Sequence, residues 1–228
     1  MAYTLITANR NYSSWSLRPW VLMKALDLPF TDRIEPFLLP DNREAFRSFS
    51  PSGLVPVLVD GERRVWDSLG IVLYLAERHP GVWPADDEAR AFAQSAAAEM
   101  HGGFSALRSR CTMNVGVRVA LAGIDAELAR DIARVRELFE EGLARFGGPW
   151  LAGAEFTALD AFFAPVAFRV RTYGLDMGEG QAWVDRILAH PAMQQWEAEA
   201  LAESWREQGH EAELAATGSL VADLRASA

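Results

Sequence analysis

Two adjacent serines, Ser13 and Ser14, lie in the stretch NYSSWSLRPW, between a short apolar run and a helical pattern. Proline lacks an N–H and is tolerated in the first turn of a helix, so Pro19 predicts that the helix begins near Ser16, a good N-cap. Ser13 and Ser14 would then lie just upstream, where free N–H groups and the helix dipole favour an anion. The residues alone leave two interpretations open: the two hydroxyls cap the helix, or one of them points at a ligand.

Two further short motifs carry polar groups to places where chain elements begin. Asp67-Ser68 precedes an apolar helical stretch and predicts an N-cap. Val55-Pro56 stands at the start of a predicted strand, where an ordinary trans proline is also common. Thr157 and Asp160 are three residues apart ahead of an apolar run, the spacing of a capping box with Asp in place of Glu, and we expect that pair to be structural.

The composition describes a globular and acidic chain. It has 228 residues, which suits one large domain or two small ones, and half of them are hydrophobic. The formal net charge of -9 disfavours general binding to nucleic acid. A single cysteine, Cys111, excludes an internal disulfide and favours a reducing compartment. We expect a soluble, cytoplasmic protein without a signal peptide, because the most apolar stretch, 158–168, is too short to span a bilayer.

The first 78 residues mix strand-like and helical periods. Short apolar runs at 3–7 and 31–36 predict strands, and the apolar runs around Asp60-Gly61 predict a β-hairpin. Helical spacing follows Ser16 and again follows Ser68, and residues 41–50 indicate a short helix or a loop. The predicted order is β-α-β-α-β-β-α.

The remainder of the chain shows helical periods only. Residues 79–87 contain prolines, a glycine and acids, and we interpret them as a linker. Apolar stripes at helical spacing then recur within residues 88–228 and predict an all-α domain, beginning with one long helix over 88–108. We therefore expect an α/β domain over residues 1–78 and a helical domain over residues 88–228.

This order of elements, together with four motifs, resembles the cytosolic glutathione S-transferase family. The motifs are SSWSLR (13–18), SPSGLVPVLVDG (50–61), WDSLGIVLYLAE (66–77) and FTALDAFFAP (156–165). The serine motif is similar to that of the zeta class, and the whole chain resembles bacterial members of the family. The resemblance implies a thioredoxin-like first domain, an all-α second domain and a glutathione transferase activity.

The resemblance also implies a role for the two serines. Glutathione would be the cosubstrate, and a serine hydroxyl would donate a hydrogen bond to its thiolate, which lowers the pKa of the thiol. Ser13 matches the catalytic serine of the zeta class, and Ser14 is the alternative donor. Trp15 stands where the zeta class has cysteine, so a serine-type transferase is favoured over a zeta-like isomerase.

Four more residues would bind glutathione if the resemblance holds. The family has a cis bond at the position of Pro56, and the backbone of Val55 would pair with the cysteinyl part of glutathione. Ser68 at a helix N-terminus would hold the γ-glutamyl carboxylate, and Asp67 would pair with the amino group.

The expected partners are a small electrophilic substrate and a second copy of the chain, with no metal, no nucleic acid and no membrane. Detoxification is the expected role. Two alternatives stay open: a glutathione-dependent isomerase or dehalogenase of the zeta kind, and a non-catalytic ligand-binding or regulatory protein on the same fold.

The second substrate would lie between the two domains. An acidic substrate would select arginines there, although solvated surface arginines explain the same residues. The residues considered for this wall are Met100, His101, Phe104, Arg108, Arg110, Cys111, Arg169, Arg171 and Tyr173.

Overall fold

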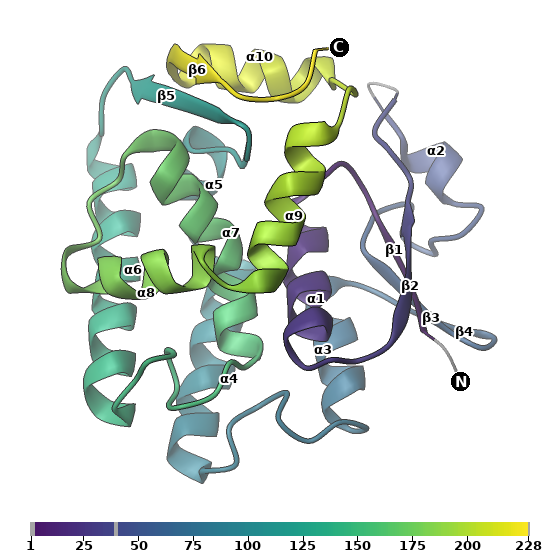
Figure 1. Ribbon diagram of the computed structural model, residues 1–228, viewed down its shortest axis with the longest axis vertical. Coiled ribbons are helices and arrows are strands. Elements are labelled where there is room, and N and C mark those ends of the chain that lie inside the picture. The colour runs from purple at the N-terminus through teal and green to yellow at the C-terminus, as the bar shows by residue number, and fades with distance from the viewer. Residues whose placement is uncertain (1–2, 39–40, 228) are drawn as a thin grey trace.

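The computed structural model describes residues 3–38 and 41–227. Figure 1 shows a small sheet on one side of the molecule and a set of helices on the other. The elements on the sheet side are β1 (Tyr3–Thr7), α1 (Ser14–Ala25), β2 (Phe30–Ile34), α2 (Arg43–Phe46), β3 (Val57–Asp60), β4 (Arg63–Val65) and α3 (Ser68–Ala76).

The four strands form one mixed sheet in the order β2-β1-β3-β4. β1 is parallel to β2 and antiparallel to β3, and β3 and β4 form the hairpin expected around Asp60-Gly61. Gly61 has a φ of 61°, which glycine adopts without the cost that a side chain imposes. The expected thioredoxin-like order is confirmed.

The second part of the chain is mainly helical, as expected. Its elements are α4 (Asp87–Gly102), α5 (Ser105–Arg110), β5 (Val117–Leu121), α6 (Ala126–Phe146), α7 (Ala158–Tyr173), the 3-10 helix η1 (Gly178–Gly180), α8 (Gln181–Leu188), α9 (Pro191–Ala202), α10 (Gln208–Thr217) and β6 (Gly218–Asp223). Among the described residues, no helix has the length and apolar character needed to cross a membrane.

Two short strands, β5 and β6, interrupt the helical pattern that the sequence predicted. They pair antiparallel with each other, and α10 and β6 lie along one end of the molecule beside β5 (Figure 1). Each strand finds its partner about a hundred residues away and has no hairpin turn, so local periodicity carries no signal for the pair.

Helix α1 begins earlier than Pro19 predicted. Its first residue is Ser14, its N-cap is Ser13, and Ser16 lies inside it. The expectation that Ser16 caps the helix was therefore wrong. The first turn does not need an N–H at position 19, because the Leu17 N–H donates to the Ser13 carbonyl (3.1 Å). A proline further along removes only the bond to Trp15.

The single helix expected over 88–108 is divided into α4 and α5. Gly102 and Gly103 end α4, and Phe104 takes a left-handed backbone conformation with a φ of 56°. The adjacent glycines favour this break, since glycine stabilises a helix less than other residues do. After this turn, α5 packs against α6, and its residue Arg108 reaches the Trp15 ring at the start of α1.

The core joins both parts of the chain around α1. Leu17 and Val21 are fully buried, and α1 packs against α3, α7 and α9. Helix α7 is buried along almost its whole length. Because α1 is fixed on several sides, the serines at its N-terminus are held on a rigid element.

Candidate active site

All six residues that the sequence selected as site residues line one cavity of about 1080 Å³. They come from the N-terminus of α1, the segment before β3 and the N-terminus of α3, and they are Ser13, Ser14, Val55, Pro56, Asp67 and Ser68. The other wall is formed by α5, α7 and the start of α10. The fold thus brings together predicted site residues that are up to 55 positions apart in the sequence.

The two serines differ in their surroundings. Ser13 is buried, and its hydroxyl donates to the hydroxyl of Ser16 (2.7 Å) rather than capping the helix. Ser14 is half-buried, and its hydroxyl makes no hydrogen bond within the described part of the chain. The Ser14 hydroxyl is therefore free to bond a ligand, and the Ser13 hydroxyl would have to leave Ser16.

The segment before β3 is held by a compact turn. The Ser50 hydroxyl donates to the Leu54 carbonyl (2.6 Å), and the Val55-Pro56 bond is cis. Gly53 has a φ of 71°, and a Cβ there would lie 2.8 Å from the Arg43 carbonyl oxygen. Only glycine fits this close approach without a shift of the backbone.

The start of α3 combines a cap with an unpaired hydroxyl. The Asp67 carboxylate accepts from the N–H groups of Leu69 (2.9 Å) and Gly70 (3.3 Å), so the expected N-cap is present. The Ser68 hydroxyl is fully buried and has no hydrogen-bond partner among residues 3–38 and 41–227. A buried hydroxyl without a partner is costly, and a ligand group at this helix N-terminus would satisfy it.

His101 from α4 reaches the same place. Its Nε2 lies 3.2 Å from Asp67 Oδ2, and its ring packs edge-on against Trp15. Burial lowers the pKa of His101, and the nearby charges of Arg18 and Arg108 lower it further against the opposite effect of Asp67. A neutral imidazole donating to the carboxylate fits this environment, and it makes His101 a packed residue rather than a strong base.

Three arginines lie at the cavity or next to it. The guanidinium of Arg18 lies 4.2 Å from the ring centre of Trp15, and that of Arg108 lies 4.3 Å from it. Arg108 and Arg169 line the cavity, while Arg18 is buried behind Trp15. The sequence places Arg18 in the SSWSLR motif but indicates no role for it. Its burial depends on packing against α7, which no local pattern indicates.

The remaining candidates for the second wall divide into two groups. Arg110 forms ion pairs with Asp125 and Glu127, and Arg171 forms one with Glu197 (2.7 Å). Neither lines the cavity.

The other candidates for this wall are buried in the helical part. Cys111 and Met100 are fully buried, and Phe104 packs edge-on against Phe163. The hydroxyl of Tyr173 donates to the Thr112 carbonyl (2.8 Å). Burial raises the pKa of Cys111 to about 11, as expected for an inert thiol.

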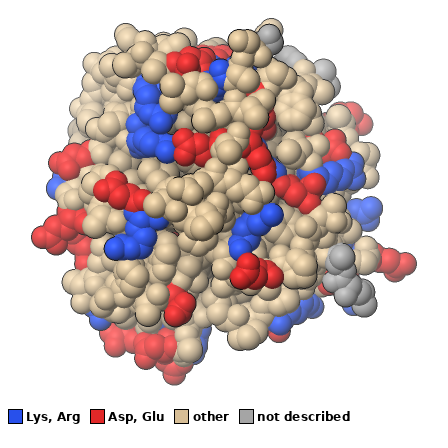
Figure 2. Space-filling view, in the orientation of Figure 1, with Lys and Arg blue, Asp and Glu red and all other residues tan. Residues whose placement is uncertain are grey.

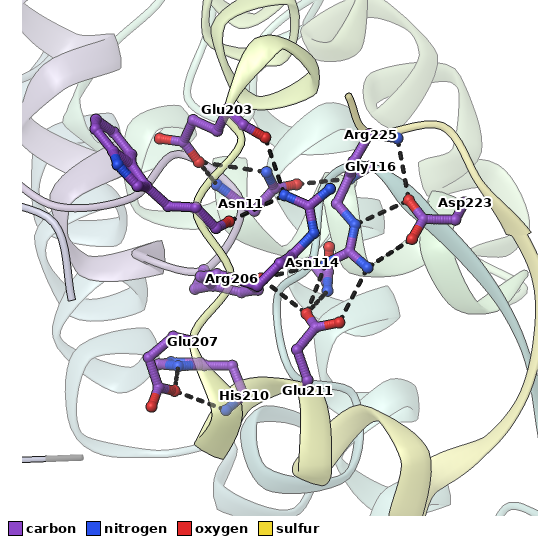
Figure 3. A network of polar contacts seen from close by, with 12 residues as sticks. Asn11, Asn114, Gly116, Glu203, Arg206, Glu207, His210, Glu211, Asp223 and Arg225 are labelled. Carbon is purple, nitrogen blue, oxygen red and sulfur yellow. Dashed lines mark hydrogen bonds and ion pairs between the residues drawn. The ribbon is translucent and has the colours of Figure 1, made fainter. Parts of the chain in front are cut away.

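The C-terminal segment contributes a wall that sequence analysis missed. His210 at the start of α10 lines the cavity and stacks on Tyr12, with ring centres 4.8 Å apart. Figure 3 shows the polar network behind this wall, in which the Glu211 carboxylate accepts two hydrogen bonds from the guanidinium of Arg225. The Tyr12 hydroxyl donates to the same carboxylate (2.7 Å), and Asn11 donates to Glu203. The loop that precedes the serines is thereby tied to the last helices.

Among the described residues, no group of three or more His, Cys, Asp or Glu side chains is placed to hold a metal ion. The site instead offers hydroxyls, two helix N-termini and arginines, which are groups that bind anions.

A thioredoxin-like sheet followed by a helical part, with a polar cavity at the N-termini of α1 and α3, defines the class of glutathione-dependent enzymes that the sequence resembles. Family models agree: the N-terminal domain of glutathione S-transferases matches residues 12–78, and the C-terminal domain matches residues 120–199. The chain belongs to the glutathione S-transferase family. This confirms the expected family and enzyme class, a glutathione transferase.

Individual relatives are similar at moderate identity. Glutathione S-transferase 3 of Zea mays is 30% identical over 65% of this chain and 72% of that protein. The maleylacetoacetate isomerase of Rhizobium meliloti (strain 1021) is 32% identical over 56% of this chain and 63% of that protein. The theta-class glutathione S-transferase from Xanthomonas axonopodis pv. citri, solved with glutathione bound, is 25% identical and covers 85% of this chain and 96% of its own, with a TM-score of 0.64.

Proposed function

We propose that the protein is a serine-type transferase that holds glutathione in this cavity and adds its thiolate to a small electrophile. The observation that supports the proposal most is that all six predicted site residues line one cavity. The similar theta-class structure, which holds glutathione, supports the choice of cosubstrate.

The N-terminus of α3 would bind the γ-glutamyl end of glutathione. The buried hydroxyl of Ser68 lacks a partner in the described chain, and the helix dipole adds favourable potential for the carboxylate. Asp67 keeps its carboxylate at the cavity surface and would pair with the amino group. The backbone N–H and C=O of Val55 would pair with the cysteinyl part and so direct the sulfur toward α1.

At α1 a serine hydroxyl would donate a hydrogen bond to the sulfur. A free thiol has a pKa near ~8.5, so little thiolate exists at neutral pH without such help. The free hydroxyl of Ser14 favours it as the donor, whereas the Ser13 hydroxyl already donates to Ser16. The thiol proton would pass to solvent. The thiolate would then form a C–S bond with the electrophile, and the leaving group would depart with its electron pair.

A titration of glutathione, followed through the ultraviolet absorbance of the thiolate, tests this mechanism. Ser14→Ala should raise the pKa of the bound thiol by about one to two units, since a hydrogen bond to a charged group contributes about 1.5–3 kcal/mol. Glutathione should still bind. Ser95→Ala, on the exposed face of α4, is the matched control and should change nothing.

The outcomes separate the parts of the proposal. An effect in Ser13→Ala alone would transfer the donor role to Ser13. If neither serine changes the thiolate signal, the serine mechanism fails. If the wild-type protein does not bind glutathione, the transferase proposal fails as a whole and a non-catalytic role replaces it.

A zeta-like isomerase is the second candidate, because one similar relative is named a maleylacetoacetate isomerase. Trp15 occupies the place of the zeta cysteine and fills the space beside Arg18 and Arg108. Turnover of a cis-alkene diacid to its trans isomer without loss of glutathione would favour the isomerase, whereas consumption of glutathione favours the transferase.

We further propose that the protein forms a homodimer and acts in the cytoplasm. The dimer is supported by exposed apolar side chains: Leu73 on α3 is about half exposed, and so are Trp66 just before α3 and Leu54 in the segment before β3. Exposed apolar side chains of this size are typical of an interaction surface.

A further inference from the structure

Arg108 and Arg169, which line the cavity, have no carboxylate partners in the described chain. Arg108 donates to the carbonyls of His101 (3.2 Å) and Gly103 (3.4 Å). Arg169 is buried and donates to the carbonyls of Cys111 (2.7 Å) and Pro165 (3.2 Å). Carbonyl oxygens orient a guanidinium but do not neutralise it, so both keep a full charge at the cavity wall.

Arg18 adds a third charge behind that wall. It is 1% exposed, and its Nε and Nη1 atoms have no hydrogen-bond partner among the described residues. Its guanidinium faces the rings of Trp15 and Phe162 instead. Burial lowers the pKa values of Arg18, Arg108 and Arg169, and the three charges disfavour one another. A bound anion would relieve this repulsion.

The contrast with two nearby arginines supports a site at the cavity. Arg110 and Arg171, each two positions after a cavity arginine, are both paired with carboxylates. On the face shown in Figure 2, Lys and Arg side chains are interspersed with Asp and Glu. Although the chain has a net charge of -9, Arg108 and Arg169 at the cavity and Arg18 beside it leave a local excess of positive charge.

Four carboxylates also line the cavity, and each of them has another partner or is exposed to solvent. Asp67 pairs with His101, and Glu207 caps α10. Asp41 accepts from a backbone N–H at the mouth of the cavity, and Glu213 is exposed on α10. Of these four, none forms an ion pair with Arg18, Arg108 or Arg169 among the described residues, and the charge of Asp67 raises the pKa of Arg18 against the effect of burial.

We infer that the second substrate is an anionic electrophile whose carboxylate, or a similar oxyanion, is bound by Arg108 and Arg169. Planar guanidinium groups pair well with oxyanions, and a cavity that excludes part of the water strengthens that pairing. The Trp15 ring beside Arg108 offers an apolar surface for the body of the same molecule. The inference rests on the proposed transferase function and adds the chemical class of its second substrate.

Direct binding of two unreactive analogues tests the inference without turnover. We would measure 3-nitrobenzoate and its neutral counterpart 3-nitrobenzamide by calorimetry, with the full chain, at low salt, and with and without glutathione. The wild-type protein should bind the carboxylate at least about tenfold more tightly than the amide. Arg108→Gln should remove most of this preference, and Arg108→Lys should restore part of it.

Arg110→Gln is the matched control, because Arg110 lies on the same helix and pairs with carboxylates outside the cavity. It should leave the preference unchanged. Circular dichroism of each variant checks that it has folded. The variant Arg169→Gln, at a buried position that lines the cavity, is a second test and should also reduce the preference for the carboxylate.

Turnover of the reactive pair, 4-chloro-3-nitrobenzoate and 4-chloro-3-nitrobenzamide, with glutathione gives a second measurement. After division by the uncatalysed rates, kcat/KM should favour the carboxylate in the wild-type protein and lose that preference in Arg108→Gln.

Equal affinity for the two analogues in the wild-type protein would overturn the inference. So would a preference that Arg108→Gln leaves intact, or an effect of that variant on glutathione affinity alone, which would assign the arginines to glutathione. Absence of glutathione binding would instead overturn the proposed function, and the analogue preference would still be measured.

Discussion

Asp160 is fully buried between hydrogen-bond donors that hold two segments of the helical part together. Its Oδ1 accepts from the Leu151 N–H (3.0 Å) and the Trp183 indole (2.8 Å), and its Oδ2 accepts from the Thr157 N–H (3.0 Å). The capping box expected from the sequence is confirmed. Asp160→Asn should lower the free energy of unfolding by about 1–3 kcal/mol, because an amide NH₂ would face one pair of donors. Urea denaturation measures the change, and an unchanged midpoint would contradict it.

The same residue gives a pH dependence with a definite sign. Burial raises the pKa of Asp160 to about 6, against the lowering effect of its hydrogen bonds. The folded state therefore holds the proton more tightly than the unfolded state, and stability from this group falls as pH rises from about 4 to 6. From pH 4.5 to 7, the wild-type protein should lose about 2 kcal/mol relative to Asp160→Asn. A difference that is constant with pH would contradict the raised pKa.

At this scale, the sequence indicated the residues whose partners are local. Asp67 and Thr157 stand at helix starts, where polar side chains have a recognisable spacing. Arg18 and Arg108 could not be assigned in the same way. Their environment is set by the Trp15 ring and by helices distant in sequence. An arginine in a sequence motif does not indicate whether its guanidinium is buried or solvated.

At the scale of the elements, the attachment of α10 to the rest of the molecule can be tested directly. The guanidinium of Arg225 is almost fully buried and pairs with Glu211, which also accepts from Tyr12. A Cβ on Gly116 would lie 2.3 Å from the Arg225 Cγ, so glycine is required for this close approach. Arg225→Gln should loosen α10 and speed its amide hydrogen exchange by about tenfold or more, since it removes a partly buried charge pair.

Hydrogen exchange read by mass spectrometry would locate the effect to α10 and to the loop before α1. Arg134→Gln, which breaks the ion pairs between α4 and α6, is the matched control and should leave α10 unchanged. Equal exchange of α10 in the wild-type protein and Arg225→Gln would show that apolar packing alone holds this helix.

The elements show where prediction from sequence stops. Strands and helices of residues 3–78 follow local periods and a hairpin turn, and they were predicted in the right order. The boundary of α1 and the break between α4 and α5 were not, because each depends on backbone bonds that a proline or a glycine pair permits but does not require. β5 and β6 escaped prediction because each strand is stabilised only by the other.

For the whole molecule, the proposed homodimer has a direct test. Sedimentation should give about twice the mass of one chain, and Leu73→Glu on α3 should shift the protein to monomers, since a buried charge at an apolar interface is costly. Ile124→Glu replaces an equally exposed apolar residue outside α3 and should leave the dimer intact. A monomeric wild-type protein would contradict the proposal. The division into domains at residues 79–87 stays a prediction.

The hydrogen bonds between α10 and the loop before Ser13 also have a consequence for folding during synthesis on the ribosome. Tyr12 and Glu211 are 199 positions apart. At ordinary speeds of translation, the serines emerge about 10 to 40 seconds before the residues that anchor their loop. The sheet of a nascent chain can therefore fold early, yet its affinity for glutathione should rise only after Glu211 and Arg225 have left the ribosomal tunnel.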